Sequence, residues 1–295
     1  MLSRRALLGG LGGVGALVLA GCVGDAAPSP AGPSTSEDAG VTTTHAYGDD
    51  PAQVCDLILT STEPRATVIL VHGGYWQAGY DRTLEDAVAA DLVADGYAVW
   101  NVDYRGVGAG GGRPATFDDI AAAVDLLATV GSEAGLDLAR VVIVGHSAGG
   151  QLALWAAGRP TLPEGVPGAG PLLVPIAAAS QAGVNDLVTA QEQSLGGASV
   201  ASLLEIDPDV PVPADVAAIT SPAQMVPLGV PQLIVTGADD VTVPPSQSET
   251  YADATSAAGD EVRLEVVAGE EHFAHLDPGS ECWALVKAWL LDVLG

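Results

Sequence analysis

Apolar residues divide the chain from about residue 54 onward into short runs that alternate with longer amphipathic stretches. Runs rich in β-branched residues predict strands, at 54–60, 67–71, 98–102, 141–144, 172–177, 232–236 and 262–267. Apolar residues at helical spacing lie between most of these runs, at 84–94, 117–130, 148–157, 246–258 and 282–294. This alternation predicts an α/β fold, with a mainly parallel central sheet and helices on both of its faces.

Residues 181–230 depart from this alternation. The segment has only short helical patterns, at 187–195 and 199–204, and it contains five prolines, at 208, 211, 213, 222 and 227. An irregular insertion before a strand is more typical of a cap over a pocket than of a second core. We therefore expect one α/β domain over residues 46–295, with residues 181–230 as a small cap.

The first 22 residues have the features of an export signal. Arg4 and Arg5 precede an apolar run at 6–20 that is too short to span a membrane as a helix. Leu-Ala-Gly-Cys at 19–22 resembles the lipobox of bacterial lipoproteins, in which Cys22 is lipidated and becomes the new N-terminus. We expect residues 1–21 to be a lipoprotein-type signal peptide, and a Sec signal with an incidental Cys22 is the alternative. The arginine pair is also similar to a twin-arginine signal.

Residues 22–45 consist mostly of Ala, Pro, Ser, Gly, Thr and Asp. Such a segment has few apolar side chains to bury, so it predicts a flexible tether. The complete arrangement indicates an exported protein of the bacterial cell envelope, held at the outer face of the membrane by a lipid on Cys22.

The formal net charge of −27 changes which partners are plausible. A surface this acidic repels phosphate backbones and anionic headgroups, which argues against nucleic-acid binding and leaves membrane attachment to the lipid. If the protein is exported, Cys55 and Cys282 would lie in an oxidising compartment, so a disulfide between them is one possibility. No cluster of Cys and His has metal-ligand spacing, so no metal is expected.

The segment 141–157 joins a predicted strand to a predicted helix through Gly145-His146-Ser147-Ala148-Gly149. G-x-S-x-G in this context is typical of a nucleophile elbow. A side chain at either glycine would collide with the neighbouring strand or helix. The elbow exposes the Ser147 hydroxyl above the sheet and directs the backbone N–H of Ala148 toward an anion beside it. We predict Ser147 as the nucleophile and Ala148 as an oxyanion donor.

A serine hydroxyl reacts only when a base takes its proton. His272 and His275 follow the last predicted strand, where a loop can reach back over the sheet. His272, the first after the strand, is the predicted base, and His275 is the alternative. The orienting carboxylate is expected between Ser147 and His272 in the chain. Asp240, just past the strand at 232–236, is the predicted acid, and Asp239 is a solvated neighbour.

The strand at 67–71 runs into His72-Gly73-Gly74-Tyr75-Trp76. This loop resembles the glycine loop of lipases and esterases, whose backbone N–H groups form the oxyanion hole. We predict Gly74 and Tyr75 as donors. Trp76, His72 and His146 are expected to line the substrate pocket, although Tyr75 and Trp76 could instead be core aromatics.

Three motifs resemble the α/β-hydrolase family over essentially all of residues 54–294. They are His-Gly-Gly-Tyr-Trp at 72–76, Asp-Tyr-Arg-Gly at 103–106 and Gly-His-Ser-Ala-Gly-Gly at 145–150. The set looks most like the esterase/lipase branch that includes kynurenine formamidases and feruloyl or acetyl esterases. This resemblance implies a serine hydrolase that needs no cofactor and acts on a small-molecule ester or amide.

A carboxylic ester with a small acyl group is the expected substrate, because the bulky Tyr75 and Trp76 lie beside the oxyanion loop. An aryl formamide is the alternative substrate. The rival from another class is a tethered binding protein that kept the fold without the chemistry. The sequence argues against it, since nucleophile, acid, base and glycine loop follow one another in the expected order on the expected elements.

Overall fold

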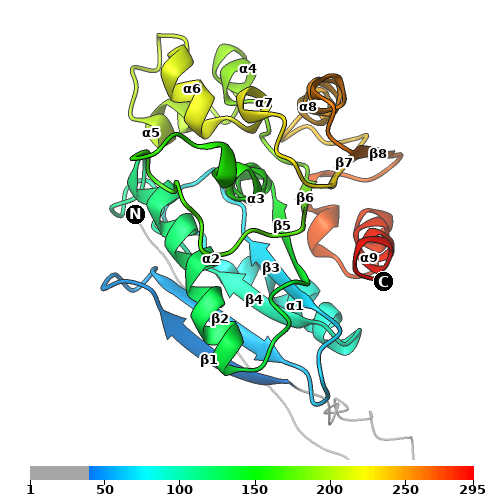
Figure 1. Cartoon of the computed structure of the whole chain (residues 1–295). Coiled ribbons are helices and arrows are strands. Elements are labelled where there is room, and N and C mark those ends of the chain that lie inside the picture. Colours follow the sequence, from blue (N-terminus) through cyan, green and yellow to red (C-terminus); the bar gives the residue numbers. More distant parts are fainter. Residues whose placement is uncertain (1–39) are drawn as a thin grey trace, which may run out of the picture. The chain divides into compact units, whose positions relative to one another are not determined.

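A computed structural model describes residues 40–295 as a single eight-stranded sheet with helices on both faces (Figure 1). The strand order is β1-β2-β4-β3-β5-β6-β7-β8. The first two strands run antiparallel to their neighbours, and every pairing from β4 to β8 is parallel. The strands are β1 (Val41–Ala46), β2 (Val54–Leu59), β3 (Thr67–Val71), β4 (Ala98–Val102), β5 (Val141–His146), β6 (Ala177–Gln181), β7 (Gln232–Gly237) and β8 (Val262–Val267).

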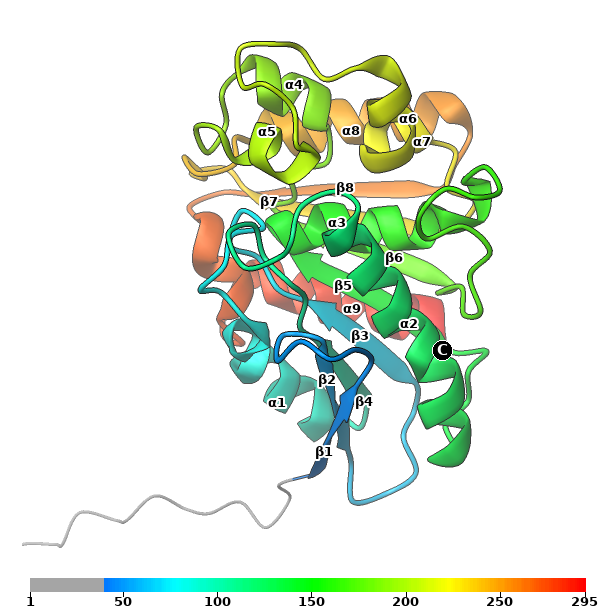
Figure 2. The same cartoon turned by 90° about the vertical axis from the view of Figure 1, so that its left-hand side faces the viewer.

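Two apolar cores lie on opposite faces of this sheet. Helices α1 (Asp86–Ala94) and α9 (Glu281–Leu294) cover one face, and helices α2 (Ala115–Glu133), α3 (Ala148–Gly158) and α8 (Pro245–Ala258) cover the other (Figure 2). The predicted fold class is confirmed. Within residues 40–295, no helix is long and apolar enough to cross a membrane.

Strand β1 corrects the predicted end of the tether. Residues 41–45 are not tether, because β1 pairs antiparallel with β2 in a register that sets Val41 opposite Leu59. Its three consecutive threonines are β-branched and suit an exposed edge strand, although they contribute no apolar signal. The predicted signal peptide, Cys22 and residues 22–39 of the tether lie outside the described residues.

The predicted strand at 172–177 is wrong, and the strand at this place in the sheet is β6, Ala177–Gln181. Its sequence, Ala-Ala-Ala-Ser-Gln, has little intrinsic strand propensity. A small side chain is needed at Ser180 because α3 packs closely on this part of β6. A Cβ at Gly150 would lie 2.5 Å from Ser180 Oγ and 3.0 Å from the Cα of Gly183. Tertiary packing therefore decides the location of this strand.

The predicted cap is the connection between β6 and β7. It carries four short helices, which gather near α3 at the top of Figure 1, with α8 beside them. The helices α4 and α5 agree with the two predicted helical patterns, and α6 and α7 were not predicted. They are α4 (Leu187–Glu192), α5 (Ser199–Leu204), α6 (Ala214–Thr220) and α7 (Pro222–Met225).

The two cysteines of the described residues are both free, so the possible disulfide does not form. Cys55 belongs to the core under α2 and α3, whereas Cys282 belongs to the core under α1 and α9. The sheet separates the two thiols, and a disulfide requires Cα atoms within about 7 Å.

Glu85, the last residue of the 3-10 helix η1 (Arg82–Glu85), is buried, and its Oε1 has no hydrogen-bond partner among residues 40–295. Burial raises the pKa of this carboxyl to about 8, and the nearby Asp86 adds to the effect. Between pH 4.5 and 8 the folded protein therefore keeps a proton that the unfolded chain releases. Stability contributed by the neutral carboxyl is lost as the pH rises through this window.

Glu85→Gln is expected to raise the free energy of unfolding relative to wild type at pH 8, because the amide carries no charge that must be desolvated. The increase in the free energy of unfolding caused by Glu85→Gln should be larger at pH 8 than at pH 4.5, by on the order of a few kcal/mol. Urea unfolding at both pH values measures it, with the exposed Glu164→Gln as the matched control. An equal effect of Glu85→Gln at the two pH values would contradict the assignment.

Candidate active site

Ser147 lies at a sharp turn between β5 and α3, with a φ of +56°. The turn leaves no space for larger residues at its glycines. A Cβ at Gly145 would overlap the carbonyl oxygen of Gly149, and a Cβ at Gly149 would overlap the carbonyl oxygen of Val71. The backbone N–H of Ser147 donates to the carbonyl of Gln181 at 2.8 Å, which ties the turn to the end of β6. The steric reason for G-x-S-x-G is therefore the one expected from the sequence.

Three segments that are far apart in the sequence meet at this turn. Nε2 of His272 lies 3.0 Å from Ser147 Oγ, and Nδ1 of His272 lies 2.7 Å from Asp240 Oδ2. All three residues are at most 4% exposed. A hydroxyl, an imidazole and a carboxylate thus form one hydrogen-bonded line, shielded from bulk water.

The backbone of its own loop holds the Asp240 carboxylate. Its Oδ1 accepts the N–H groups of Thr242 and Val243, each at 2.8 Å, which leaves Oδ2 for the imidazole. Asp239 is exposed, as expected for a solvated neighbour. Because both oxygens of Asp240 are engaged, the carboxylate orientation is fixed and sets the orientation of His272.

His146, the residue before Ser147, lines the pocket and supports the histidine loop, the 3-10 helix η3 (His272–Leu276). Its Nε2 lies 2.9 Å from the backbone carbonyl oxygen of His272. A carbonyl only accepts, so Nε2 carries the proton. Burial, aided by the nearby imidazole of His272, lowers the pKa of His146 to about 3, so this ring is neutral at physiological pH.

His275, the alternative base, is fully buried beside His146, with ring centroids 5.8 Å apart. Burial lowers its pKa well below the usual value, and neither ring nitrogen has a hydrogen-bond partner among the described residues. His275 does not reach Ser147, so the structure favours His272 over His275 as the base.

The glycine loop after β3 has an unusual backbone that matches its predicted role. Three consecutive residues have positive φ, namely Gly74 (+111°), Tyr75 (+50°) and Trp76 (+58°). Among the hydrogen bonds of residues 40–295, none uses the backbone N–H of Gly74, Tyr75 or Ala148. Free N–H groups on a strained loop beside a helix N-terminus are what an oxyanion hole requires.

The side chain of Tyr75 connects this loop to the acid loop. Its hydroxyl donates to the carbonyl of Thr242 at 2.8 Å, and Thr242 lies two residues after Asp240. Its ring lies against Gly196 of the cap, where a Cβ would come within 2.5 Å of the ring. The side chain of Tyr75 therefore connects the oxyanion loop to the acid loop and to the cap, and Tyr75 is not a plain core aromatic.

Two predicted pocket residues, Trp76 and His72, do not line the pocket. Trp76 is fully buried and donates from its indole N–H to Gln151 Oε1 at 3.0 Å. His72 is buried, stacks on Tyr104 with ring centroids 4.2 Å apart and lies 3.3 Å from Asp103 Oδ1. Both side chains turn away from Ser147 because they anchor the loop from beneath, so the pocket prediction is wrong for them.

The pocket over Ser147 has a volume of about 180 Å³. Its walls are mostly apolar, and several were not predicted because nothing in the sequence distinguishes them from ordinary loop residues. No residue of the cap is among them, so the predicted cap lies beside the pocket instead of over it. The lining residues of the described chain are Gly73, Gly74, Tyr75, Tyr80, Leu84, His146, Ser147, Thr242, His272, Phe273 and Leu276.

With this geometry established, the chain can be placed among known proteins. Residues 56–254 match the family model BD-FAE. The chain belongs to the BD-FAE family. This family of α/β-hydrolase-type esterases confirms the resemblance to the esterase branch. No curated protein matches this BD-FAE chain.

Solved structures share the fold of this BD-FAE protein. A truncated carbohydrate esterase from gut microbiota is 21% identical, with a TM-score of 0.71, over 88% of this chain and 98% of that one. Esterase B from Lactobacillus rhamnosis is 21% identical, with a TM-score of 0.72, over 87% of this chain and 85% of that one. The carboxylesterase Cest-2923 from Lactobacillus plantarum WCFS1 is 19% identical, with a TM-score of 0.69, over 85% of this chain and 97% of that one.

Proposed function

We propose that this BD-FAE protein is a serine hydrolase that cleaves small-acyl carboxylic esters through an acyl-enzyme on Ser147. The hydrogen-bonded line from Ser147 through His272 to Asp240 carries the proposal. A binding protein that had lost the chemistry would have no reason to keep this line together with an oxyanion loop of positive φ. Assays of carboxylic esters and N-formyl aryl amides test the proposal and compare it with the formamidase alternative.

The geometry supports the following sequence of steps. Ser147 Oγ attacks the acyl carbon while Nε2 of His272 takes its proton, and Asp240 stabilises the resulting imidazolium. The N–H groups of Gly74, Tyr75 and Ala148 stabilise the tetrahedral oxyanion, each worth about 3 to 4 kcal/mol when removed. His272 then protonates the leaving alcohol, and water hydrolyses the acyl-enzyme by the same route.

A short acyl chain is supported by the size of the pocket. Its volume of about 180 Å³ is below the roughly 300–1,000 Å³ of pockets that enclose drug-sized ligands. Two structural neighbours were solved with compounds that carry four-carbon chains: Esterase B with a C4-C4 SN3 tributyrin phosphonate, and Est2 from Thermogutta terrifontis with butyrate.

We expect kcat/KM to be higher for acetyl and butyryl esters than for the octanoyl ester of the same alcohol, by about tenfold or more, because eight carbons overfill the pocket. Initial rates on p-nitrophenyl acetate, butyrate and octanoate measure this preference. A highest kcat/KM for octanoate would contradict the small-acyl assignment while leaving the serine mechanism in place.

We also propose that the enzyme is exported and anchored to the outer face of a bacterial membrane through a lipid on Cys22. The basic start, the short apolar run and the Leu-Ala-Gly-Cys motif support this location. Cys22→Ser should remove lipidation, so the protein should move from the detergent phase to the aqueous phase in Triton X-114 partitioning. Wild-type protein in the aqueous phase would contradict the anchor.

A further inference from the structure

We propose that the active site selects esters by charge and favours a short-chain ester whose alcohol part is cationic, such as a quaternary ammonium alcohol. Neutral esters follow, and anionic esters are the poorest substrates. This inference rests on the proposed esterase function. It is carried by unpaired carboxylates around the pocket, by the location of the cationic side chains and by aromatic rings at the pocket mouth.

Three exposed carboxylates belong to residues that directly precede or follow pocket-lining residues in the sequence, and we call Asp81, Glu271 and Asp277 the acidic rim. Each is next in sequence to a lining residue, namely Tyr80, His272 and Leu276. The carboxylates of Asp81 and Asp277 accept backbone N–H groups, and within residues 40–295 none of the three is in an ion pair. Hydrogen bonds from Thr83 lower the pKa of Asp81, so this carboxylate is charged at neutral pH.

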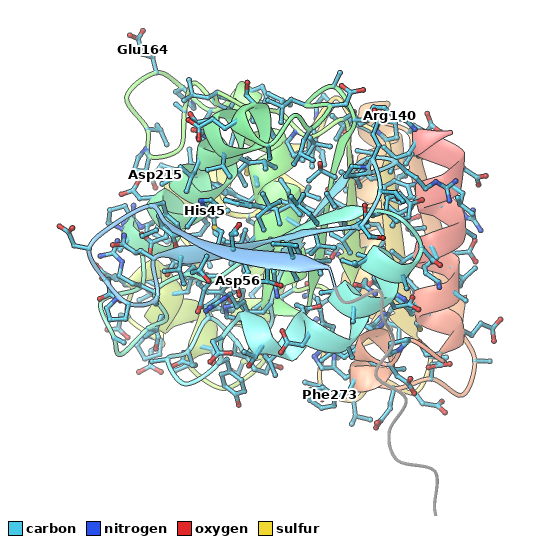
Figure 3. The ribbon with its side chains drawn as sticks, turned by 90° about the horizontal axis from the view of Figure 1, so that it is seen from below. His45, Asp56, Arg140, Glu164, Asp215 and Phe273 are labelled. Atoms are coloured by element: carbon cyan, nitrogen blue, oxygen red, sulfur yellow. The ribbon has the colours of Figure 1, made fainter. Side chains whose placement is uncertain are left out.

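No lysine or arginine of the described chain lines the pocket. Arg82, next to Asp81, is held by Asp56 at 2.6 Å and by Asp103 at 3.1 Å, so its charge is already neutralised. Arg140 precedes β5, at the opposite end of that strand from Ser147, and Figure 3 shows it well separated from Phe273. An anionic substrate would therefore meet carboxylates and find no lysine or arginine among the residues that line the pocket.

Aromatic rings at the mouth of the pocket would attract a cationic substrate. The Phe273 ring packs edge-on against the His272 ring, with centroids 5.1 Å apart, yet Phe273 remains 59% exposed. Tyr80 is 52% exposed, and its ring lies against Gly74 of the oxyanion loop. Aromatic faces attract cations, and a quaternary ammonium also presents methyl groups that suit the apolar walls. The rings and the acidic rim thus favour the same charge.

Three acetyl esters of matched shape test the inference: acetylcholine, its neutral isostere 3,3-dimethylbutyl acetate, and the anionic 2-acetoxyethanesulfonate. Each kcat/KM is divided by the hydroxide-catalysed rate of the same ester, which removes differences in intrinsic reactivity. At low ionic strength we expect the cation to exceed the neutral ester by about tenfold, and the neutral ester to exceed the anion similarly. The differences should narrow at high salt.

Phenyl acetate is assayed in parallel to separate the two levels of the proposal. Equal normalised values for the three esters, or an anion as good as the neutral ester, overturn the charge selectivity while hydrolysis of phenyl acetate upholds the esterase. Failure to hydrolyse any of the four esters overturns the proposed function as well.

A pair of double variants assigns the selectivity to the acidic rim. Asp81→Asn with Glu271→Gln removes two rim charges, and Glu164→Gln with Asp215→Asn removes two exposed charges that Figure 3 places far from Phe273. The rim variant should lower the ratio of cationic to neutral kcat/KM about threefold or more, and the remote variant should leave it unchanged. Equal ratios in both variants would overturn the role of the rim.

Discussion

Ser147→Ala is expected to lower kcat for ester hydrolysis by about 10⁶-fold. Without Oγ no acyl-enzyme forms, and His272 has no hydroxyl to deprotonate at 3.0 Å. The fold should persist, because Ser147 contributes its backbone N–H to the turn and the substitution leaves that bond to Gln181 intact. Steady-state kinetics on a short-chain ester measure the loss of kcat, and circular dichroism measures whether the fold persists.

A fluorophosphonate probe adds a readout that does not depend on the choice of substrate. Wild-type enzyme should be labelled on Ser147, and Ser147→Ala should not be labelled at all. Ser132→Ala, which removes an exposed hydroxyl near the end of α2, is the matched control and should be labelled like wild type. A wild-type enzyme that resists the probe would favour the rival interpretation as a binding protein.

Local steric constraints explain why the sequence located the nucleophile. Gly145 and Gly149 are required by close approaches of backbone to backbone, and these leave a recognisable pattern in a short stretch of chain. The histidine and the acid leave weaker patterns, but their places after β8 and β7 put both at the carboxyl edge of the sheet with Ser147. The order of Ser147, Asp240 and His272 along the chain was then enough to predict that their side chains meet.

Side-chain direction could not be deduced in the same way. Trp76 and His72 lie within two residues of Gly74, yet both point into the protein. The Trp76 indole donates to Gln151 and the His72 ring stacks on Tyr104, and both of these partners are distant in sequence. The strand β6 was misplaced for a related reason: its alanines and Ser180 have little strand propensity, and they are buried between the two cores on either face of the sheet. Such features depend on packing between distant elements, which local patterns do not encode.

Asp240→Asn is expected to lower kcat by about 10⁴-fold while preserving the fold. The reason lies in the two backbone N–H groups, of Thr242 and Val243, that Oδ1 accepts at 2.8 Å. An asparagine would keep its amide oxygen there and turn its NH₂ group toward Nδ1 of His272. That nitrogen would then have to accept, which places the ring proton on Nε2. An imidazole protonated at Nε2 cannot take the proton of Ser147.

The comparison with Asp253→Asn isolates this tautomer effect from a change in net charge. Asp253 is exposed on α8, so its substitution changes the charge equally and should leave kcat within about twofold of wild type. Loss of activity in Asp240→Asn should appear in kcat far more than in KM, because the acid orients the base and makes no contact with the pocket interior. If Asp240→Asn kept kcat within tenfold of wild type, His272 would not depend on Asp240 for its tautomer. That result would contradict the role of Asp240 in proton transfer.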